Sequence, residues 1–300
     1  MKILRTRNEL QHWRAGLEAT RPTVGFVPTM GALHRGHAEL LRRIRPRCDV
    51  SVLSIFVNPT QFGPSEDLAK YPRTFERDLE LACAQGVDVL FAPAPEEMYS
   101  SAHSTFVEET QVSRPLCGQF RPGHFRGVTT VVLKLFNLVR PKLALFGMKD
   151  AQQFFVLHQM NRDLDLRVSV EAIPTVREPD GLALSSRNAY LSADHRELAP
   201  RFYKTLAETS TRLRAGAPLS ATLEAGRQAL EACGFTVQYL DCVELPTFNS
   251  PNVVLPGCPY LLAAAVYLGA TRLIDNVIVN PAALTAIGYS APSFEPAESS

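Results

Sequence analysis

The chain has 300 residues, of which 46% are hydrophobic and 20% charged, and its net charge is +1. This length and composition predict a globular protein of one large or two ordinary domains, and the charge gives no indication of binding to nucleic acid or an anionic membrane. The six cysteines include no Cys-x-x-Cys pair, which favours a reduced cytoplasmic protein over a disulfide scaffold. No signal-peptide pattern opens the chain, and the most apolar run, 260–270, is too short to span a bilayer.

Strands and helices alternate through the first half of the chain. Near-continuous apolar runs such as 50–57 are typical of strands in a parallel sheet that is covered on both faces. We therefore expect an α/β fold, a Rossmann-like parallel sheet with helices on both faces. The expected strands are 23–27, 50–57, 87–92, 143–146 and 167–173, and the expected helices are 8–17, 38–45, 72–84, 128–139 and 151–162.

The regular alternation ends at 174–181, where proline, glycine and charged residues cluster. We place a domain boundary there, which divides the chain into residues 1–175 and 176–300. The second part is expected to be a smaller α+β C-terminal domain, and 291–300 a frayed tail. Its expected helices are 192–213 and 219–233, and its expected strands are 236–243, 259–268 and 271–279.

The stretch 24–37 combines an apolar strand, a break at Pro28, Gly31 and Gly36, and two histidines at the start of a helical pattern. A strand, a glycine turn and a helix N-terminus together are a common phosphate-binding arrangement. His34 and His37 are three residues apart and share one helix face, where they can donate hydrogen bonds to anionic oxygens. Ordinary turn glycines with surface histidines, or half of a zinc site, are the alternatives, although no cysteine or carboxylate cluster nearby would complete a zinc site.

Polar clusters also follow several of the expected strands, at 28–37, 58–61, 147–153 and 176–187. The carboxyl ends of parallel strands meet at one edge of a sheet, where ligands bind. Taken singly, each cluster has an ordinary alternative: Asn58 and Pro59 form a common turn pair, and Asp150 is a plausible helix cap. Together they suit a phosphate and a small polar substrate, with Lys149 and Arg187 supplying positive charge.

Five segments resemble the motifs of the pantothenate synthetase (pantoate–β-alanine ligase) family. The segments are 28–37 (PTMGALHRGH), 56–62 (FVNPTQF), 146–153 (FGMKDAQQ), 180–188 (DGLALSSRN) and 271–276 (TRLIDN). The His-x-Gly-His element alone is shared with other adenylyltransferases and class I tRNA synthetases. The full set, in order and across nearly the whole chain, is much more specific.

The resemblance implies an ATP-dependent ligase that condenses (R)-pantoate with β-alanine to pantothenate, in the pathway to coenzyme A. It implies a pantoyl-adenylate intermediate, release of AMP and pyrophosphate, and Mg²⁺ bound with ATP. It also implies a cytoplasmic homodimer with small-molecule substrates and with no nucleic-acid or membrane partner. No covalent enzyme intermediate is expected, in agreement with the lack of a clear Ser–His or Cys–His arrangement.

The same resemblance implies the roles of individual residues. The residues implied at the ATP site are Met30, Gly31, Ala32, Leu33, His34, Arg35, Gly36, His37, Gly147, Met148, Lys149, Asp150, Val176, Leu184, Ser185, Ser186 and Arg187. Those with implied catalytic roles are His37 as a proton donor, His34, Lys149 and Arg187. Pantoate is assigned to Gln61 and Gln153, with Asn58 and Tyr71 assisting and Gln61 also near β-alanine.

Further implied details are a backbone contact from Val176 to adenine, Mg²⁺ or ribose near Asp150, and a C-terminal domain that closes over the ATP site. Our physical interpretation of the histidines is stabilisation of charge on the phosphoryl group by donors at a helix N-terminus. Met148 stands where the family usually has glutamate, and Leu184 where it usually has methionine; the second exchange conserves volume.

Three other functions fit parts of the sequence. A different nucleotidyltransferase would need a basic site for a second, phosphorylated substrate, and a module that only senses ATP would not need Gln61 and Gln153. A tRNA synthetase would need a basic anticodon-binding domain, which a near-neutral chain of this length does not suggest.

Overall fold

The structure is a computed structural model, and it describes residues 1–64, 66 and 68–287. The chain forms two compact units, which are described separately. The first unit consists of Met1–Ser113, Arg121–Gly147 and Gln153–Ile173, and the second of Arg114–Phe120, Met148–Gln152 and Pro174–Ser300. The expected tail at 291–300 lies outside the described residues. The division at 175/176 and the closure of the second part over ATP stay predictions.

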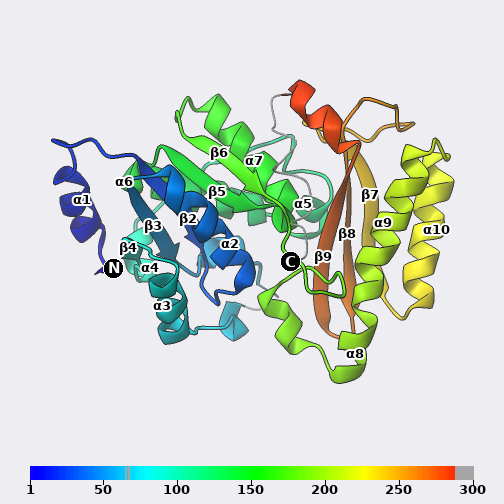
Figure 1. Cartoon of the computed structure of the whole chain (residues 1–300), viewed down its shortest axis with the longest axis horizontal. Coiled ribbons are helices and arrows are strands. Elements are labelled where there is room, and N and C mark those ends of the chain that lie inside the picture. Colours follow the sequence, from blue (N-terminus) through cyan, green and yellow to red (C-terminus); the bar gives the residue numbers. More distant parts are fainter. Residues whose placement is uncertain (65, 67, 288–300) are drawn as a thin grey trace. The chain divides into compact units, whose positions relative to one another are not determined.

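A six-stranded parallel sheet forms the centre of the first unit (Figure 1). Its strands in spatial order are β1 (Lys2–Leu4), β4 (Val89–Phe91), β3 (Val50–Ile55), β2 (Val24–Thr29), β5 (Leu143–Gly147) and β6 (Ser169–Ile173). From β2 the chain proceeds outward to β3 and β4, and then returns to the other side of β2 as β5. The order therefore reverses between β2 and β5, the position at which open parallel sheets bind ligands beyond the carboxyl ends of the strands.

Helices cover both faces of this sheet, as the sequence predicted. The Phe26 ring of β2 packs edge-on against Phe136 of α6, with 6.4 Å between ring centroids. The next residue, Val27, packs in a separate hydrophobic cluster with Leu41 and Ile44 of α2. Because successive strand residues point to opposite faces, α6 and α2 lie on opposite sides of the sheet. The helices are α1 (Arg7–Ala15), α2 (Arg35–Ile44), α3 (Phe75–Ala84), α4 (Pro95–Met98), α6 (His124–Val139) and α7 (Ala151–Asp163).

Three details of the first unit differ from the sequence-based expectation. β2 runs through Pro28 instead of breaking there, because it pairs with β5 at Gly25 and Phe26, before the proline, so the missing N–H removes no bond from that ladder. Helix α6 begins at His124, four residues before the start of the expected helix 128–139. The edge strand β1 has three residues, too few to show a periodic pattern.

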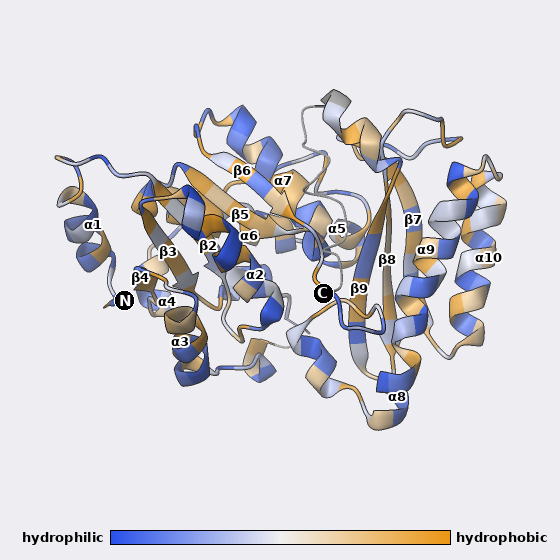
Figure 2. Cartoon of the chain, viewed as in Figure 1, coloured by the Kyte–Doolittle hydropathy of each residue, from blue (hydrophilic) through white to orange (hydrophobic). Residues whose placement is uncertain are grey.

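The second unit contains a three-stranded antiparallel sheet in the order β7–β8–β9, with helices α9 and α10 packed against it (Figure 1). The central strand β8 is buried along nearly its whole length and is predominantly hydrophobic in Figure 2, which explains the apolar run near 260–270. The expected helix at 192–213 is divided by Pro200, which begins α9. The elements are α5 (Cys117–Phe120), α8 (Ala193–Leu198), α9 (Pro200–Arg214), α10 (Leu219–Ala232), β7 (Thr236–Glu244), β8 (Tyr260–Leu268) and β9 (Thr271–Val279).

In the part of the chain that the structure describes, none of the helices is both long enough and apolar enough to cross a membrane.

Candidate active site

The turn after β2 is held by a buried carboxylate. Asp78 of α3 is 1% exposed, and its two oxygens accept the backbone N–H groups of Ala32 (2.9 Å) and Leu33 (2.7 Å). Gly31 and Ala32 both have positive φ angles, 84° and 50°, so the turn bends through the left-handed region. These hydrogen bonds, which the carboxylate of Asp78 accepts, fix the conformation of the turn and thereby set where the following helix begins.

Asp78 was not identified from the sequence. A signal was present, because residues three and four apart on a helix share a face, and Asp78 shares one with Phe75 and Ala82. A carboxylate on the apolar face of an amphipathic helix needs partners within the protein. Those partners are set by how α3 packs against the turn, and this packing cannot be predicted from the pattern of residues along α3.

His34 and His37 form a reciprocal cap at the start of α2. The Nδ1 atom of His34 accepts the Gly36 N–H (3.1 Å), and the Nδ1 atom of His37 accepts the His34 N–H (3.2 Å). The two ring centroids lie 4.2 Å apart. Because each Nδ1 acts as an acceptor, a neutral imidazole in this geometry carries its proton on Nε2. The two side chains therefore present N–H donors beside a helix N-terminus, which is itself an anion-binding feature.

The glycine between the histidines has a steric role. A Cβ atom on Gly36 would lie 2.8 Å from Cε1 and 3.0 Å from Nδ1 of His34. Any other residue would therefore displace the His34 ring and its bond to the Gly36 N–H. The His-x-Gly-His pattern is thus a local requirement of this cap.

Gln61 follows β3 in the short 3₁₀ turn η2 (Pro59–Gln61), and Asn58 fixes its side chain. The Asn58 amide nitrogen donates to Gln61 Oε1 and to the Gly127 carbonyl, each at 3.1 Å, and its oxygen accepts from the N–H and hydroxyl of Thr60. Asn58 is 1% exposed and Gln61 7%. The Gln61 amide nitrogen contacts Met30 Sδ at 2.8 Å, a weak acceptor that a ligand oxygen can replace. Asn58 therefore orients Gln61 with hydrogen bonds made entirely within the protein.

A second network holds the backbone of the same glutamine. The Gln61 carbonyl accepts from His124 Nδ1 (2.8 Å) and Arg121 Nη2 (3.3 Å), while His124 Nε2 and Arg121 Nη1 are 3.0 Å apart. Arg121 also forms a bidentate pair with Glu66, at 2.8 and 2.6 Å. Burial alone would raise the pKa of Glu66, but the hydrogen bonds and charge of Arg121 outweigh it and lower that pKa. These residues lie outside the motifs that the sequence singled out, and no role was predicted for them.

In the second unit, Asn276 of β9 holds the segment that carries Lys149 and Asp150. Its amide nitrogen donates to the carbonyl oxygens of Met148 (2.8 Å) and Lys149 (3.1 Å). Lys149 Nζ lies 3.6 Å from Asp150 Oδ2. The Met148 side chain is buried, where a thioether needs no partner but a glutamate would need one. The departure from the usual glutamate therefore agrees with the local packing of this chain.

Arg177 ties the 176–184 segment to β9. Its guanidinium forms a bidentate pair with the buried carboxylate of Asp275 (2.6 and 2.9 Å), donates to the Gly181 carbonyl (3.1 Å) and lies 3.4 Å from the centre of the Tyr203 ring. A buried pair with this many contacts fixes geometry, and removal of one partner would leave an uncompensated charge. Asp275 and Asn276, which are adjacent in one motif, thus hold two different candidate loops.

The hairpin-like turn around Gly181 sets the position of Ser185 to Arg187. The Leu184 N–H donates to the Val176 carbonyl at 3.0 Å. Ser185 then caps the 3₁₀ turn η5 (Ser186–Tyr190), because its hydroxyl accepts the Arg187 N–H at 3.3 Å. Val176, Leu184 and the serines are therefore parts of one ordered element of the second unit.

The neighbouring glutamines 152 and 153 differ in their use. Gln152 is buried and its amide is engaged on both sides, accepting the Cys117 N–H (3.1 Å) and donating to the Pro115 carbonyl (2.7 Å). Gln153 is half-buried, and the described residues provide no hydrogen bond to its amide. Of the other candidates, Tyr71 is buried, with its ring 5.9 Å from that of Phe62, and Arg35 is exposed in the first turn of α2.

Within residues 1–64, 66 and 68–287, no group of three or more histidines, cysteines, aspartates and glutamates is placed to hold a metal ion. The two histidines of the cap also use their Nδ1 atoms to accept backbone N–H groups. For the described residues, the geometry therefore favours the anion-binding interpretation of this stretch over the zinc alternative.

Comparison with known proteins identifies one family. Residues 2–278 match the model of the family described as pantoate-beta-alanine ligase. A pantothenate synthetase of Myxococcus xanthus is 49% identical over 277 residues, which cover 92% of this chain and 95% of that protein. A pantothenate synthetase of Thermotoga neapolitana is 47% identical over 281 residues, covering 93% and 100%.

Solved structures agree with these relatives. The crystal structure of pantothenate synthetase from Thermus thermophilus matches with a TM-score of 0.85 and 46% identity, covering 92% of this chain and 99% of that one. A pantoate-beta-alanine ligase from Francisella tularensis, complexed with Beta-gamma ATP and β-alanine, matches with a TM-score of 0.78 and 33% identity, covering 93% and 97%.

Proposed function

Since the chain belongs to the pantoate–β-alanine ligase family, we propose that it works through a pantoyl-adenylate intermediate and releases AMP and pyrophosphate. The enzyme condenses pantoate with β-alanine in pantothenate biosynthesis, and it uses ATP. The observation that best supports the adenylate mechanism is the reciprocal histidine cap, which directs two imidazole N–H donors to the N-terminus of α2. Such donors suit negative charge that develops on a phosphoryl group.

The residues that we propose for ATP binding are those of the family resemblance. They are Met30 to His37, Gly147 to Asp150, Val176 and Leu184 to Arg187. His34 and His37 donate to phosphate oxygens, while Lys149 and Arg187 supply positive charge. Support comes from the ordered loops that carry these residues: Asp78 fixes the first, Asn276 the second and Arg177 the third.

Gln61 and Gln153 bind pantoate, the first also lying near β-alanine. The Gln61 amide is buried and oriented by Asn58, while the Gln153 amide has no hydrogen bond among the described residues. Amides are suited to hydroxyl and carboxylate oxygens because they donate and accept without adding charge. The saturated contacts of Asn58 favour a role in positioning Gln61, and buried Tyr71 contributes to the wall of this site.

In the first step a carboxylate oxygen of pantoate attacks the α-phosphorus of ATP. A new bond forms between that oxygen and phosphorus, and the bond to the pyrophosphate oxygen breaks. The carbonyl carbon of a free carboxylate reacts poorly with an amine. The mixed anhydride formed in this step gives that carbon a good leaving group, AMP. The chain's part is to align the reactants and to place His34, His37, Lys149 and Arg187 against the charge on the phosphates.

In the second step the amine of β-alanine attacks the carbonyl carbon of pantoyl adenylate. The C–N bond forms, the C–O bond breaks with its electron pair leaving on AMP, and the amine proton passes to solvent. His37 is the proton donor of the family resemblance, and its Nε2–H faces away from the cap that holds Nδ1. Gln61 keeps the acyl group oriented through both steps.

Magnesium would enter with ATP. The Asp150 carboxylate is half-exposed and beside Lys149, and Mg²⁺ is commonly held by one or two carboxylates together with substrate phosphates, so this donor set fits. When bound, the ion would neutralise part of the negative charge on the phosphates of ATP. The proposal also includes a cytoplasmic location and a homodimer. A mass of twice that of the chain in analytical ultracentrifugation would support the homodimer.

A direct assay tests this function. The protein is mixed with ATP, Mg²⁺, pantoate and β-alanine, and AMP, pyrophosphate and pantothenate are measured. We expect all three products in equal amounts, and no pyrophosphate when pantoate is omitted. Pyrophosphate release that is indifferent to pantoate would contradict the proposed adenylation.

A further inference from the structure

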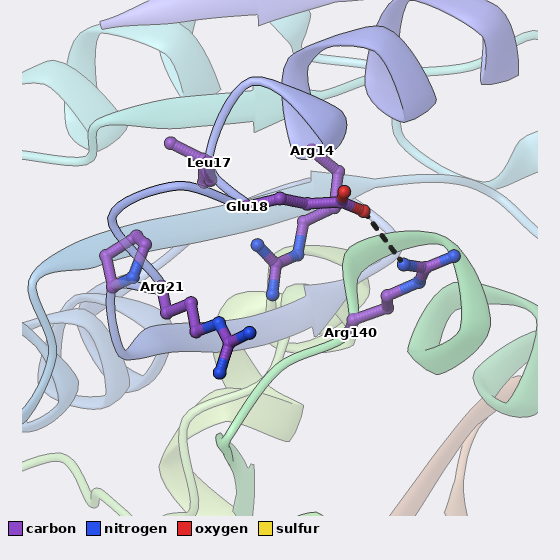
Figure 3. A pocket seen from close by; sticks show the side chains of 6 residues that line it. Arg14, Leu17, Glu18, Arg21 and Arg140 are labelled. Atoms are coloured by element: carbon purple, nitrogen blue, oxygen red, sulfur yellow. Dashed lines mark ion pairs between the residues drawn. The ribbon is translucent and has the colours of Figure 1, made fainter.

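A basic pocket lies in the first unit, and its lining residues are separate from the loops of the same unit that we propose to bind ATP and pantoate. It encloses about 370 Å³ and is lined by Arg14, Leu17, Glu18, Arg21, Pro22 and Arg140 (Figure 3). None of these residues belongs to the proposed catalytic or substrate-binding set. Its volume falls within the roughly 300–1,000 Å³ of typical small-molecule sites.

Three chain segments bring the arginines together at one edge of the sheet. Arg14 is in the last turn of α1, Arg21 precedes β2, and Arg140 ends α6 shortly before β5. Arg21 and Arg140 both have positive φ angles, 46° and 49°. The pocket therefore adjoins the amino ends of β2 and β5. The loops proposed to bind ATP in this unit follow the carboxyl ends of the same strands, at the opposite edge of the sheet.

The positive charge in this pocket is only partly balanced. Glu18 lies 3.8 Å from Arg140, but both side chains are about two-thirds exposed (69% and 66%), so this pair is weak. The described residues provide no hydrogen bond or ion pair to the guanidinium groups of Arg14 and Arg21, and Arg14 Nε is buried without a partner. Figure 3 shows the Arg14 side chain extending between Glu18 and Arg21. A buried donor in this state needs an acceptor.

We propose that this pocket binds a small phosphate-bearing anion. Planar guanidinium groups donate pairs of parallel hydrogen bonds to phosphate oxygens, and two such groups converge here while a third is held only weakly. Leu17 and Pro22 add an apolar wall, which suits an organic phosphate as well as an inorganic one. A phosphate would also give buried Arg14 Nε the acceptor that the described residues do not provide.

The test is calorimetric titration of the full-length protein with inorganic pyrophosphate. Phosphate groups also bind at the proposed catalytic site, so binding at the pocket is identified as the part that changes when the pocket arginines are replaced. We expect saturable binding that weakens as salt is added, because the attraction is electrostatic. The R14A/R21A double variant should bind at least about tenfold more weakly, since charge-assisted bonds are lost. R212A, an exposed arginine on α9, is the matched control and should bind as the unaltered protein does.

Two additions make this experiment decisive. R21Q alters an exposed side chain, so it keeps the test valid if the double variant folds poorly, and it should weaken binding severalfold. Titration with glycerol phosphate beside pyrophosphate distinguishes an organic from an inorganic ligand, and binding of either supports the proposal. Absence of saturable binding for both anions, or equal affinity in the unaltered protein and in R21Q, would overturn it.

Discussion

His34 and His37 each use one ring nitrogen, Nδ1, to accept a backbone N–H group at the start of α2. Their Nδ1 atoms complete a helix cap, in a role that serine and glutamate usually fill, and this choice fixes the position of the Nε2–H groups. The structural and chemical contributions of His37 can be separated, because glutamine at the third helical position also caps a helix but has no imidazole.

Replacing His37 tests this separation. H37A removes the acceptor of the His34 N–H, so we expect about 1 kcal/mol less stability towards urea and a fall of at least about a hundredfold in kcat/KM. H37Q should recover the stability and leave the activity low. Activity near that of the unaltered enzyme in H37Q would show that His37 acts through the cap alone.

The neighbouring glutamines provide a matched pair. Q153A should raise the KM for pantoate about tenfold or more with an unchanged melting temperature, because the described residues make no hydrogen bond to this amide. Q152A removes two hydrogen bonds from a buried site and should lower stability by about 1–3 kcal/mol. Steady-state kinetics and thermal unfolding of both variants check the contrast. An unchanged KM for pantoate in Q153A would remove Gln153 from the proposed site.

At the scale of elements, helix α6 serves as the backing for the turn that carries Gln61. The helix approaches so closely that a Cβ atom on Gly127 would lie 2.3 Å from the Thr60 carbonyl oxygen and 2.7 Å from the Gln61 nitrogen. The first turn of the same helix supplies His124, which donates to the Gln61 carbonyl. The position of Gln61 therefore depends on α6 through both shape and hydrogen bonding.

G127A should displace this turn. We expect a loss of about 1–3 kcal/mol in stability from overpacking, together with a higher KM for pantoate. G16A is the control, because Gly16 has an ordinary φ of −62° and a Cβ atom there would come no closer than 3.4 Å to its nearest neighbour. Urea unfolding measures the stability of the two variants, and steady-state kinetics measures their KM for pantoate. If G127A has the same stability and the same KM as G16A, α6 does not position the turn.

Sequence patterns predicted where the strands and helices lie, but they did not predict the contacts between these elements. The strands of the parallel sheet are continuous apolar runs and were predicted to within a few residues, apart from short β1. The predicted end of the strand at Pro28 was wrong. A proline without an N–H group interrupts a strand only where the partner strand is still paired, and β5 pairs with β2 only at Gly25 and Phe26. Asp78 and Asn276 act through backbone groups far away in the sequence, and such contacts leave no periodic signal.

At the scale of the whole molecule, the second unit is discontinuous in sequence. Besides Pro174–Ser300 it includes Arg114–Phe120 and Met148–Gln152. Phe120 stacks on Tyr239 of β7, with ring centroids 5.6 Å apart, and Gln152 holds the 114–120 segment by two hydrogen bonds. The predicted boundary at 175/176 would separate both segments from the sheet they pack against.

A fragment experiment tests this organisation. Residues 176–300 expressed alone should unfold with lower cooperativity than the complete chain, because Tyr239 loses its stacking partner. Circular dichroism during urea unfolding measures the transition. A sharp, cooperative transition in the fragment would instead support an independent domain that begins at 176.

An isotope experiment shows whether the pantoate carboxylate attacks the α-phosphorus of ATP. Pantoate is labelled with heavy oxygen in its carboxylate, the reaction is run with ATP and β-alanine, and the products are weighed by mass spectrometry. Attack on the α-phosphorus predicts one heavy oxygen in AMP and none in pyrophosphate. Heavy oxygen in pyrophosphate, or its complete absence from AMP, would contradict the proposed mechanism.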